Sequence, residues 1–192
     1  MVEWTIVERW ALFLTAGSYL SGFIAAELPG QLLRGLIAGF LLFVSLVMLT
    51  RWKPSPHRNL PGWGLSAVLA SLGGILSGLA GIGGGNVVVP TLVYFNTPIH
   101  RATATSSTLG FPIALAGTLG YAQRGWADTQ TYTWAAGYVY LPAFLIIVSA
   151  TVLFAPLGVR TAHRISPQPL RRAFGVLLIF VSMRMFYSLS SW

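Results

Sequence analysis

The sequence predicts an all-α fold, a polytopic bundle of about six membrane-spanning helices in which one helix is broken by glycines. Of the 192 residues 55% are hydrophobic and only 8% are charged, which leaves too little charge to cover the surface of a soluble domain. The apolar residues form runs of about 20, the length that a helix needs to cross a bilayer. Within them, residues 73–90 contain seven glycines before Pro90, more than one straight helix tolerates.

The first two spans are expected at about 10–28 and 33–50. Pro29 and Gly30 close the first, and Arg51 stops the second. A cleaved signal peptide is the alternative for the first segment. Two acidic residues at its start and the lack of a clean small-x-small cleavage site argue against that alternative. Residues 51–61, with three prolines and three basic residues, are predicted to form a polar connector.

The third apolar segment, 62–95, is too long and too rich in glycine for one helix. It is expected to break near Gly81 to Gly85 and to continue as a half-helix or extended piece to Pro90. Three further spans are expected at about 102–122, 133–157 and 170–189. With six spans, five basic residues fall on one side of the membrane and six on the other, so the positive-inside rule gives no orientation.

An internal repeat is predicted from a shift of 137 residues, which aligns the second span with the sixth. Residues 33–34 then match 170–171, and 43–45 match 180–182. Many transporters consist of two such halves, with the site at their interface. By the same shift, a partner for the glycine segment would lie before Met1. The expected organisation is therefore an incomplete first repeat of two spans (1–50), the connector (51–61) and a complete second repeat of four spans (62–192).

Two neighbouring stretches, one of glycines and one of hydroxyl residues, predict a site for a small oxyanion. Glycines let several backbone N–H groups converge on one point, and a helix N-terminus adds positive potential. Hydroxyl groups can donate to an oxyanion without burying another charge. The candidate substrate-binding residues are Gly81, Gly83, Gly84, Gly85, Asn86, Pro90, Thr103, Thr105 and Ser106.

Structural roles stay open for the same residues. The pairs Gly74–Gly78, Gly81–Gly85 and Gly35–Gly39 have the small-xxx-small spacing that lets membrane helices approach closely. The hydroxyls could instead cap a helix or bond back to its carbonyls. Three consecutive glycines at 83–85 favour binding over packing, because each weakens a helix by about 1 kcal/mol relative to alanine. Arg184, inside an apolar span, either lines an anion path or extends to the membrane interface.

Other classes of function are excluded by what the sequence lacks. The net charge is +8, but the basic residues lie mostly in short segments between apolar runs, which suits lipid headgroups and not nucleic acid. There is no cysteine, and three scattered histidines have no metal-ligand spacing, so neither metal nor cofactor is expected. No span carries paired carboxylates or a nucleophile with a base, and no nucleotide-binding motif is present, so an enzyme is not expected.

The run GLAGIGGGNVVVPTLVYF (78–95), the ATATSS segment (102–107) and the terminal LRRAFGVLLIFVSMRMF (170–186) resemble the TauE/SafE family, often called sulfite exporters. The resemblance implies eight spans in two related halves, each opening with a glycine-rich motif. It also implies transport across the cytoplasmic membrane, because the substrates assigned to or proposed for the family are small sulfur-containing anions such as sulfite and organosulfonates. Here Gly81, Gly83, Gly84, Gly85, Asn86, Pro90 and Leu92 match the second-half motif, and Ala104, Thr105 and Ser106 match the Ala-Thr-Ser signature. The first-half motif is absent.

The function expected from these observations is that of a multi-pass permease of the cytoplasmic membrane. It would move a small anion, sulfite or an organosulfonate, by alternating access at the broken helix. The expected partners are this anion and the lipid bilayer, with a homo-oligomer left open. The alternative is a non-transporting membrane subunit, or a truncated family member, whose glycines serve helix packing and assembly.

Overall fold

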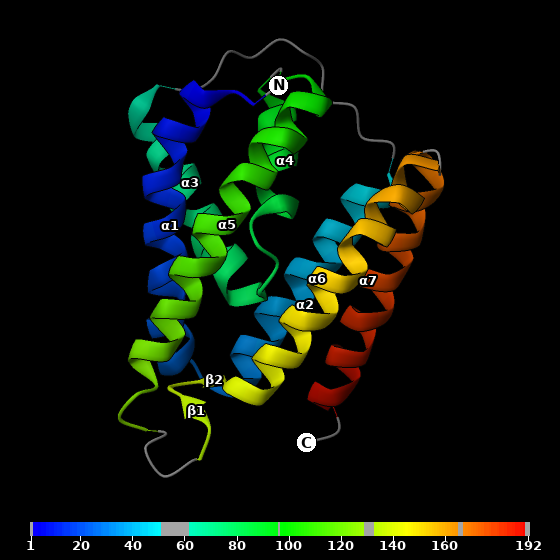
Figure 1. Cartoon of the computed structure of the whole chain (residues 1–192). Coiled ribbons are helices and arrows are strands. Elements are labelled where there is room, and N and C mark those ends of the chain that lie inside the picture. Colours follow the sequence, from blue (N-terminus) through cyan, green and yellow to red (C-terminus); the bar gives the residue numbers. More distant parts are fainter. Residues whose placement is uncertain (1, 51–61, 96, 129–132, 165–166, 191–192) are drawn as a thin grey trace. The chain divides into compact units, whose positions relative to one another are not determined.

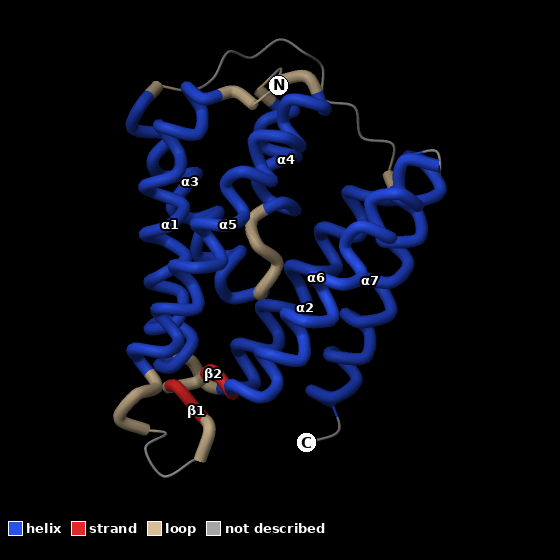
Figure 2. The backbone as a smooth tube through the Cα atoms, viewed as in Figure 1, coloured by secondary structure: helices blue, strands red, loops and turns tan. Residues whose placement is uncertain are grey.

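A computed structural model describes the chain except residues 1, 51–61, 96, 129–132, 165–166 and 191–192, so the predicted connector lies outside the described residues. The described part is mostly helical, as predicted (Figures 1 and 2). Its helices and strands are, in chain order, α1 (Trp4–Glu27), α2 (Gly30–Leu49), α3 (Trp63–Ala80), α4 (Gly85–Tyr94), α5 (Ile99–Arg124), β1 (Ala135–Ala136), β2 (Val139–Tyr140), α6 (Leu141–Arg164) and α7 (Pro167–Ser190).

Four of the described helices are long and apolar enough to cross a membrane. They contain the segments Gly30–Leu49, Trp63–Ala80, Leu141–Gly158 and Arg172–Leu189. The other two long helices, α1 and α5, have 24 and 26 residues, which is sufficient length for a span, but they are less apolar. In α5 the reason is the run of threonine and serine near its start. The total of about six spans therefore stays a prediction.

The predicted start of the fifth apolar segment, residue 133, is wrong. Residues 135–140 form an antiparallel hairpin in which Ala135 pairs with Tyr140 and Ala136 with Val139. Trp134 and Gly137 have positive φ angles of 72° and 58°, and they turn the chain before the helix can begin. Helix α6 consequently starts at Leu141. Helix α1, in contrast, begins six residues before the predicted apolar run, because its first turns pack Ile6 into the core.

The described chain divides into two compact units. The first consists of residues 1–28 and 53–125 and contains α1, α3, α4 and α5. The second consists of residues 29–52 and 126–192 and contains α2, the hairpin, α6 and α7. Each unit takes one helix from the predicted first repeat and the rest from the second. The repeat boundaries stay predictions, but the compact units do not coincide with them.

In the first unit, α1 packs closely against both α3 and α5. A Cβ atom added to Gly74 would lie 2.2 Å from the carbonyl oxygen of Leu14, and one added to Gly120 would lie 2.1 Å from that of Tyr19. Helix backbones this close admit only glycine, so the packing role proposed for Gly74 is correct. The apolar core between these helices consists of Ile6, Trp10, Leu14, Ala70, Val88, Leu92, Ala102, Leu109 and Ile113.

Helices α1 and α5 are parallel and are joined at both ends. At one end Arg101 forms an ion pair with Glu3, with 2.6 Å between Nη1 and Oε1. At the other end Arg124 Nη2 lies 2.8 Å from Glu27 Oε1. Between them the buried Ser18 hydroxyl donates to the carbonyl oxygen of Ile113 at 2.8 Å. The three contacts fix the axial register of the two helices.

In the second unit, α2 and α7 are antiparallel and exchange two hydrogen bonds. Ser45 Oγ donates to the carbonyl oxygen of Gly175, and Ser182 Oγ donates to that of Ala38, both at 2.8 Å and with both serines buried. The shift of 137 residues converts Ser45 into Ser182 and Ala38 into Gly175. Two equivalent helices related by a two-fold axis would make this reciprocal pair, which therefore supports the predicted repeat.

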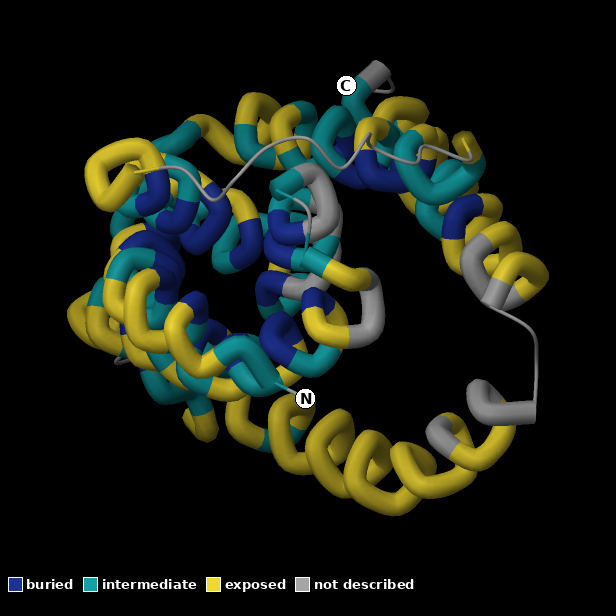
Figure 3. Tube along the Cα trace, turned by 90° about the horizontal axis from the view of Figure 1, so that it is seen from above, coloured by how far each residue is buried: buried dark blue, intermediate teal, exposed yellow. Residues whose placement is uncertain are grey.

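The same shift carries α1 (4–27) onto α6 (141–164), first residue to first and last to last. The two helices differ in their surroundings. Helix α1 contributes much of the core of the first unit, whereas the segment Leu141–Gly158 of α6 contains no buried residue (Figure 3). Helices α1 and α6 have the same length but differ in burial, so the burial of each depends on which helices it packs against.

Candidate functional site

The glycine segment interrupts the helix where the sequence predicts it. Helix α3 ends at Ala80, and Gly81 caps it in the left-handed conformation with φ 66°, its N–H directed at the carbonyl oxygens of Gly78 and Ser77. Gly83 and Gly84 also have positive φ, 65° and 81°. Residues with a Cβ atom adopt this conformation at a penalty of about 1–2 kcal/mol, so backbone geometry favours glycine at 81, 83 and 84.

The break faces the middle of α5. A Cβ atom on Gly84 would lie 2.6 Å from Ile113 Cδ1, and one on Gly110 would lie 3.2 Å from the carbonyl oxygen of Gly83. Residues 110 and 113 are close to the midpoint of α5. From there α4 extends alongside α5 and buries Val88 and Leu92 in the core. The N-terminus of a ten-residue helix is thus placed at mid-height of the first unit (Figure 2).

The carbonyl of Gly84 begins the hydrogen bonding of α4. It accepts from the N–H groups of Val87 and Val88 at 3.1 and 2.8 Å. The first N–H groups of any helix have no carbonyl partner within the helix, and together they give that end a partial positive charge. The start of α4 therefore has favourable potential for an anion, in a stretch where residues 73–99 carry no charged side chain.

Two buried hydroxyl groups, one in α3 and one in α5, have no hydrogen-bond partner among the described residues. Ser77 Oγ lies in the last turn of α3, and Ser106 Oγ lies one turn before Gly110 on α5; the two residues are 1% and 3% exposed. Leaving a buried hydroxyl unsatisfied costs about 1–3 kcal/mol. Buried polar groups normally find a partner, so each unsatisfied one in a folded protein calls for a ligand, water or another explanation.

The candidate hydroxyls of α5 divide between two faces. Thr105 is buried and accepts a hydrogen bond from the N–H of Glu3 at 3.0 Å, so it anchors the start of α1. Ser106 is buried without a partner. Thr103 is exposed, and its carbonyl accepts from the exposed Ser107 hydroxyl. Only Ser106, of these candidates, combines burial with an unoccupied hydroxyl.

The remaining candidates are placed by their backbone. Gly81 is exposed, and Gly84 is buried against α5. Gly85, Asn86 and Pro90 lie in α4, with side chains outside the described part. Sequence reasoning missed Ser77. Its position could have indicated it, because Ser77 lies four residues before Gly81, in the last helical turn before the break.

Comparison with known proteins identifies the family. The model of the family "Sulfite exporter TauE/SafE" matches residues 1–185. A probable membrane transporter protein of Haemophilus influenzae is 26% identical over 189 residues, covering 96% of this chain and 70% of its own length. Another, from Methanocaldococcus jannaschii, is 31% identical over 174 residues, covering 85% and 63%. A third, from Xylella fastidiosa, is 28% identical over 190 residues, covering 95% and 68%.

The chain thus spans about two thirds of the length of these curated relatives. No solved structure matches it. The family match covers the glycine break, the hydroxyl segment and most of α7, and the described part of the chain has four apolar helices of spanning length. The chain is therefore a multi-pass membrane protein that belongs to the TauE/SafE family of membrane transporters.

Proposed function

We propose that this chain is a permease for a small oxyanion and that the anion binds at the glycine break, between α3, α4 and α5 of the first unit. The observation that carries the proposal is the pair of buried hydroxyls, Ser77 in α3 and Ser106 in α5, which have no hydrogen-bond partner in the described part of the chain. An oxyanion has several acceptor oxygens, so it could accept from both hydroxyls and from the first N–H groups of α4.

Membrane depth strengthens the argument. Irregular backbone within a bilayer is stable only where it is enclosed by protein or lines a polar cavity, and transporters use such broken helices to bind substrate near the midplane. If α5 crosses the membrane, its midpoint, and with it Gly84, lies near mid-membrane. The positive end of the short α4 dipole would then act in a medium of low dielectric constant.

The expected substrate is sulfite or an organosulfonate. The name of the family supports sulfite. Residues 73–99 carry no charged side chain, so the site would bind the anion weakly enough to release it. A buried arginine would hold an anion tightly, whereas helix N–H groups and hydroxyls provide several weaker hydrogen bonds. Alternating access in the cytoplasmic membrane would follow from movement of α4 relative to α3 and α5, about the glycines at its start.

A second candidate is a membrane subunit that does not transport. The backbone contacts of Gly74 and Gly120 favour it, because they show that glycines of this chain do serve helix packing. The exposed helix α6 is also compatible with assembly into a larger complex. The two candidates differ in what they require of Ser77 and Ser106, since hydroxyls that only pack have no effect on anion flux.

The test is sulfite flux into proteoliposomes containing the purified chain. Losing one hydrogen bond to an anion, worth about 1.5–3 kcal/mol, corresponds to a loss of affinity of about ten- to a hundredfold. We expect that loss for Ser77→Ala and Ser106→Ala. Ser107→Ala is the matched control, because its exposed hydroxyl bonds to the carbonyl of its own helix. A wild-type chain that neither binds nor moves sulfite or a sulfonate would disprove the permease.

A further inference from the structure

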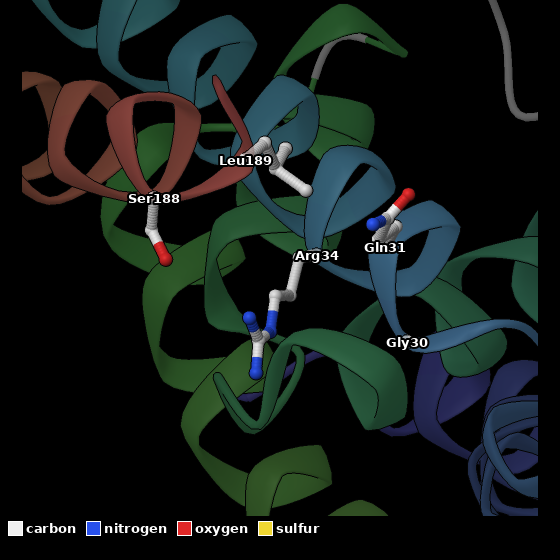
Figure 4. A pocket seen from close by; sticks show the side chains of 5 residues that line it. All are labelled: Gly30, Gln31, Arg34, Ser188 and Leu189. Carbon is white, nitrogen blue, oxygen red and sulfur yellow. The ribbon is translucent and has the colours of Figure 1, made fainter. Parts of the chain in front are cut away.

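Two adjacent cavities of about 300 Å³ each lie where α2 begins and α7 ends, inside the second unit, and Figure 4 shows the one that Gln31 lines. One is lined by Gly30, Gln31, Arg34, Ser188 and Leu189. The other is lined by Arg34, Phe180, Val181, Arg184, Met185 and Ser188. Arg34 and Ser188 line both, so the two form one groove, which we call the arginine groove.

The groove brings two positive charges together without a negative one. Within the described residues neither Arg34 nor Arg184 takes part in an ion pair. Helices α2 and α7 contain no aspartate or glutamate at all. In the whole second unit, residues 29–52 and 126–192, the sequence has seven arginines and one acidic residue, Asp128. Two guanidinium groups on one groove repel each other unless an anion lies between them.

From positions near the helix ends, the long side chains of the two arginines can reach the lipid headgroups. Arg34 lies four residues after the start of α2, and Arg184 six residues before the end of α7. At about 1.5 Å per residue these positions are about 6 and 9 Å from the helix ends. Because α2 and α7 are antiparallel, both lie toward the same side of the membrane. The headgroup layers add about 5–8 Å to each side of a hydrocarbon core of about 30 Å.

Apart from the two arginines, Gln31 and Ser188, the side chains that line the groove are apolar. Phe180, Val181 and Met185 line it beside Arg184, and Leu189 lines it beside Arg34. A hydrated inorganic anion gains nothing from such walls, whereas a lipid places its phosphate between cations and its acyl chain along apolar side chains. Arginine suits this role, since its planar guanidinium donates two hydrogen bonds to one phosphate.

We propose that the arginine groove binds the phosphate of an anionic phospholipid, held by Arg34 and Arg184, with an acyl chain along Phe180 and Met185. This site lies in the other unit from the glycine break and is independent of the proposed transport. It also gives a third interpretation of Arg184, which neither lines the anion path nor merely extends to the interface. Its role is to pair with a lipid.

The test is native mass spectrometry of the purified chain with phosphatidylglycerol and phosphatidylcholine of the same acyl chains. We expect the wild type to retain phosphatidylglycerol at least tenfold more tightly, and the double variant Arg34→Gln/Arg184→Gln to lose this preference. Arg160→Gln is the control: it removes one positive charge from the same unit, at an exposed position on α6, and should keep the preference.

Two further measurements make the result decisive. Arg34→Lys/Arg184→Lys keeps both charges, so it should fold even if the glutamine variant does not. Its preference should fall at least threefold, because lysine lacks the planar pair of N–H groups with which a guanidinium binds one phosphate. Inorganic phosphate and sulfite, added at millimolar concentration, should not displace the lipid. Equal retention of both lipids by the wild type, an equal loss in Arg160→Gln, or displacement by free anions would overturn the proposal. Sulfite flux in phosphatidylcholine vesicles tests the transport proposal separately.

Discussion

Ser45 of α2 donates a hydrogen bond to the carbonyl oxygen of Gly175 in α7 at 2.8 Å, and α7 returns an equivalent bond from Ser182. Each serine thus fixes its helix against the backbone of the other. Because the two bonds are equal in length, burial and type of partner, they should contribute equally to the packing of α2 on α7. Such symmetry is testable without knowledge of the substrate.

We expect Ser45→Ala and Ser182→Ala to lower stability by the same amount. Hydrogen bonds between membrane helices contribute about 0.6 kcal/mol on average and rarely more than about 1.7 kcal/mol. Thermal unfolding in detergent should show two similar decreases in Tm, and Ser149→Ala, at an exposed position on α6, should show none. Clearly unequal decreases would argue against the equivalence of the two helices.

Gly81→Ala should lower the stability of the protein, and Gly39→Ala should raise it. Neither position has an atom within 4 Å of an added Cβ, so only the backbone conformation differs. At Gly81, with φ 66°, alanine is strained by about 1–2 kcal/mol. At Gly39, inside α2, alanine favours the helix by about 1 kcal/mol. Chemical unfolding in mixed micelles would measure both, and a stabilised Gly81→Ala would mean that the break is not a left-handed cap.

Gly74→Ala tests the close approach of α1 and α3. The new Cβ would lie 2.2 Å from the Leu14 carbonyl oxygen, so the helices must separate, and overpacking of this kind costs about 1–3 kcal/mol. Gly64→Ala, in the same helix with nothing within 4 Å, is the control and should not destabilise. The yield of folded protein in a mild detergent would report the difference. An intact Gly74→Ala protein of normal stability would exclude backbone contact at this position.

Thr105→Val and Ser106→Ala should separate stability from function. Thr105 accepts a bond from the Glu3 N–H, so its loss should cost about 0.5–1.5 kcal/mol of stability and leave anion affinity unchanged. Ser106 has no partner in the described structure, so alanine should raise stability by about 1–3 kcal/mol while lowering affinity. Tm and sulfite binding measured on the same samples would check both. Lower stability in Ser106→Ala would mean that its hydroxyl is already bonded to the protein.

The fold was predictable where one local property decided the structure. Long apolar runs gave the helices, and consecutive glycines gave the break, because no other residue takes φ near +65° to +81° so readily. The hairpin at 135–140 was missed because its residues are apolar and continue the run that precedes α6. Apolar character alone does not separate a hairpin from the first turn of a helix.

The candidate site was predictable only in part. Glycines and hydroxyls could be selected by type, but which hydroxyls are buried depends on the face of α5 that α1 and α4 cover. Thr103 and Ser106 are three residues apart and have opposite exposures. Ser77 carries no motif of its own, so only packing revealed it. Likewise, Arg34 and Arg184 are 150 residues apart, and only the antiparallel pairing of α2 and α7 places them on one groove.

The two ion pairs and the Ser18 bond between α1 and α5 limit how the first unit can change shape. Sliding one of these helices by a single residue, about 1.5 Å, would misalign all three contacts at once. Backbone contact at Gly74 ties α3 to the same assembly. If the chain works by the alternating access proposed above, we expect these three long helices to stay in place and the ten residues of α4 to move.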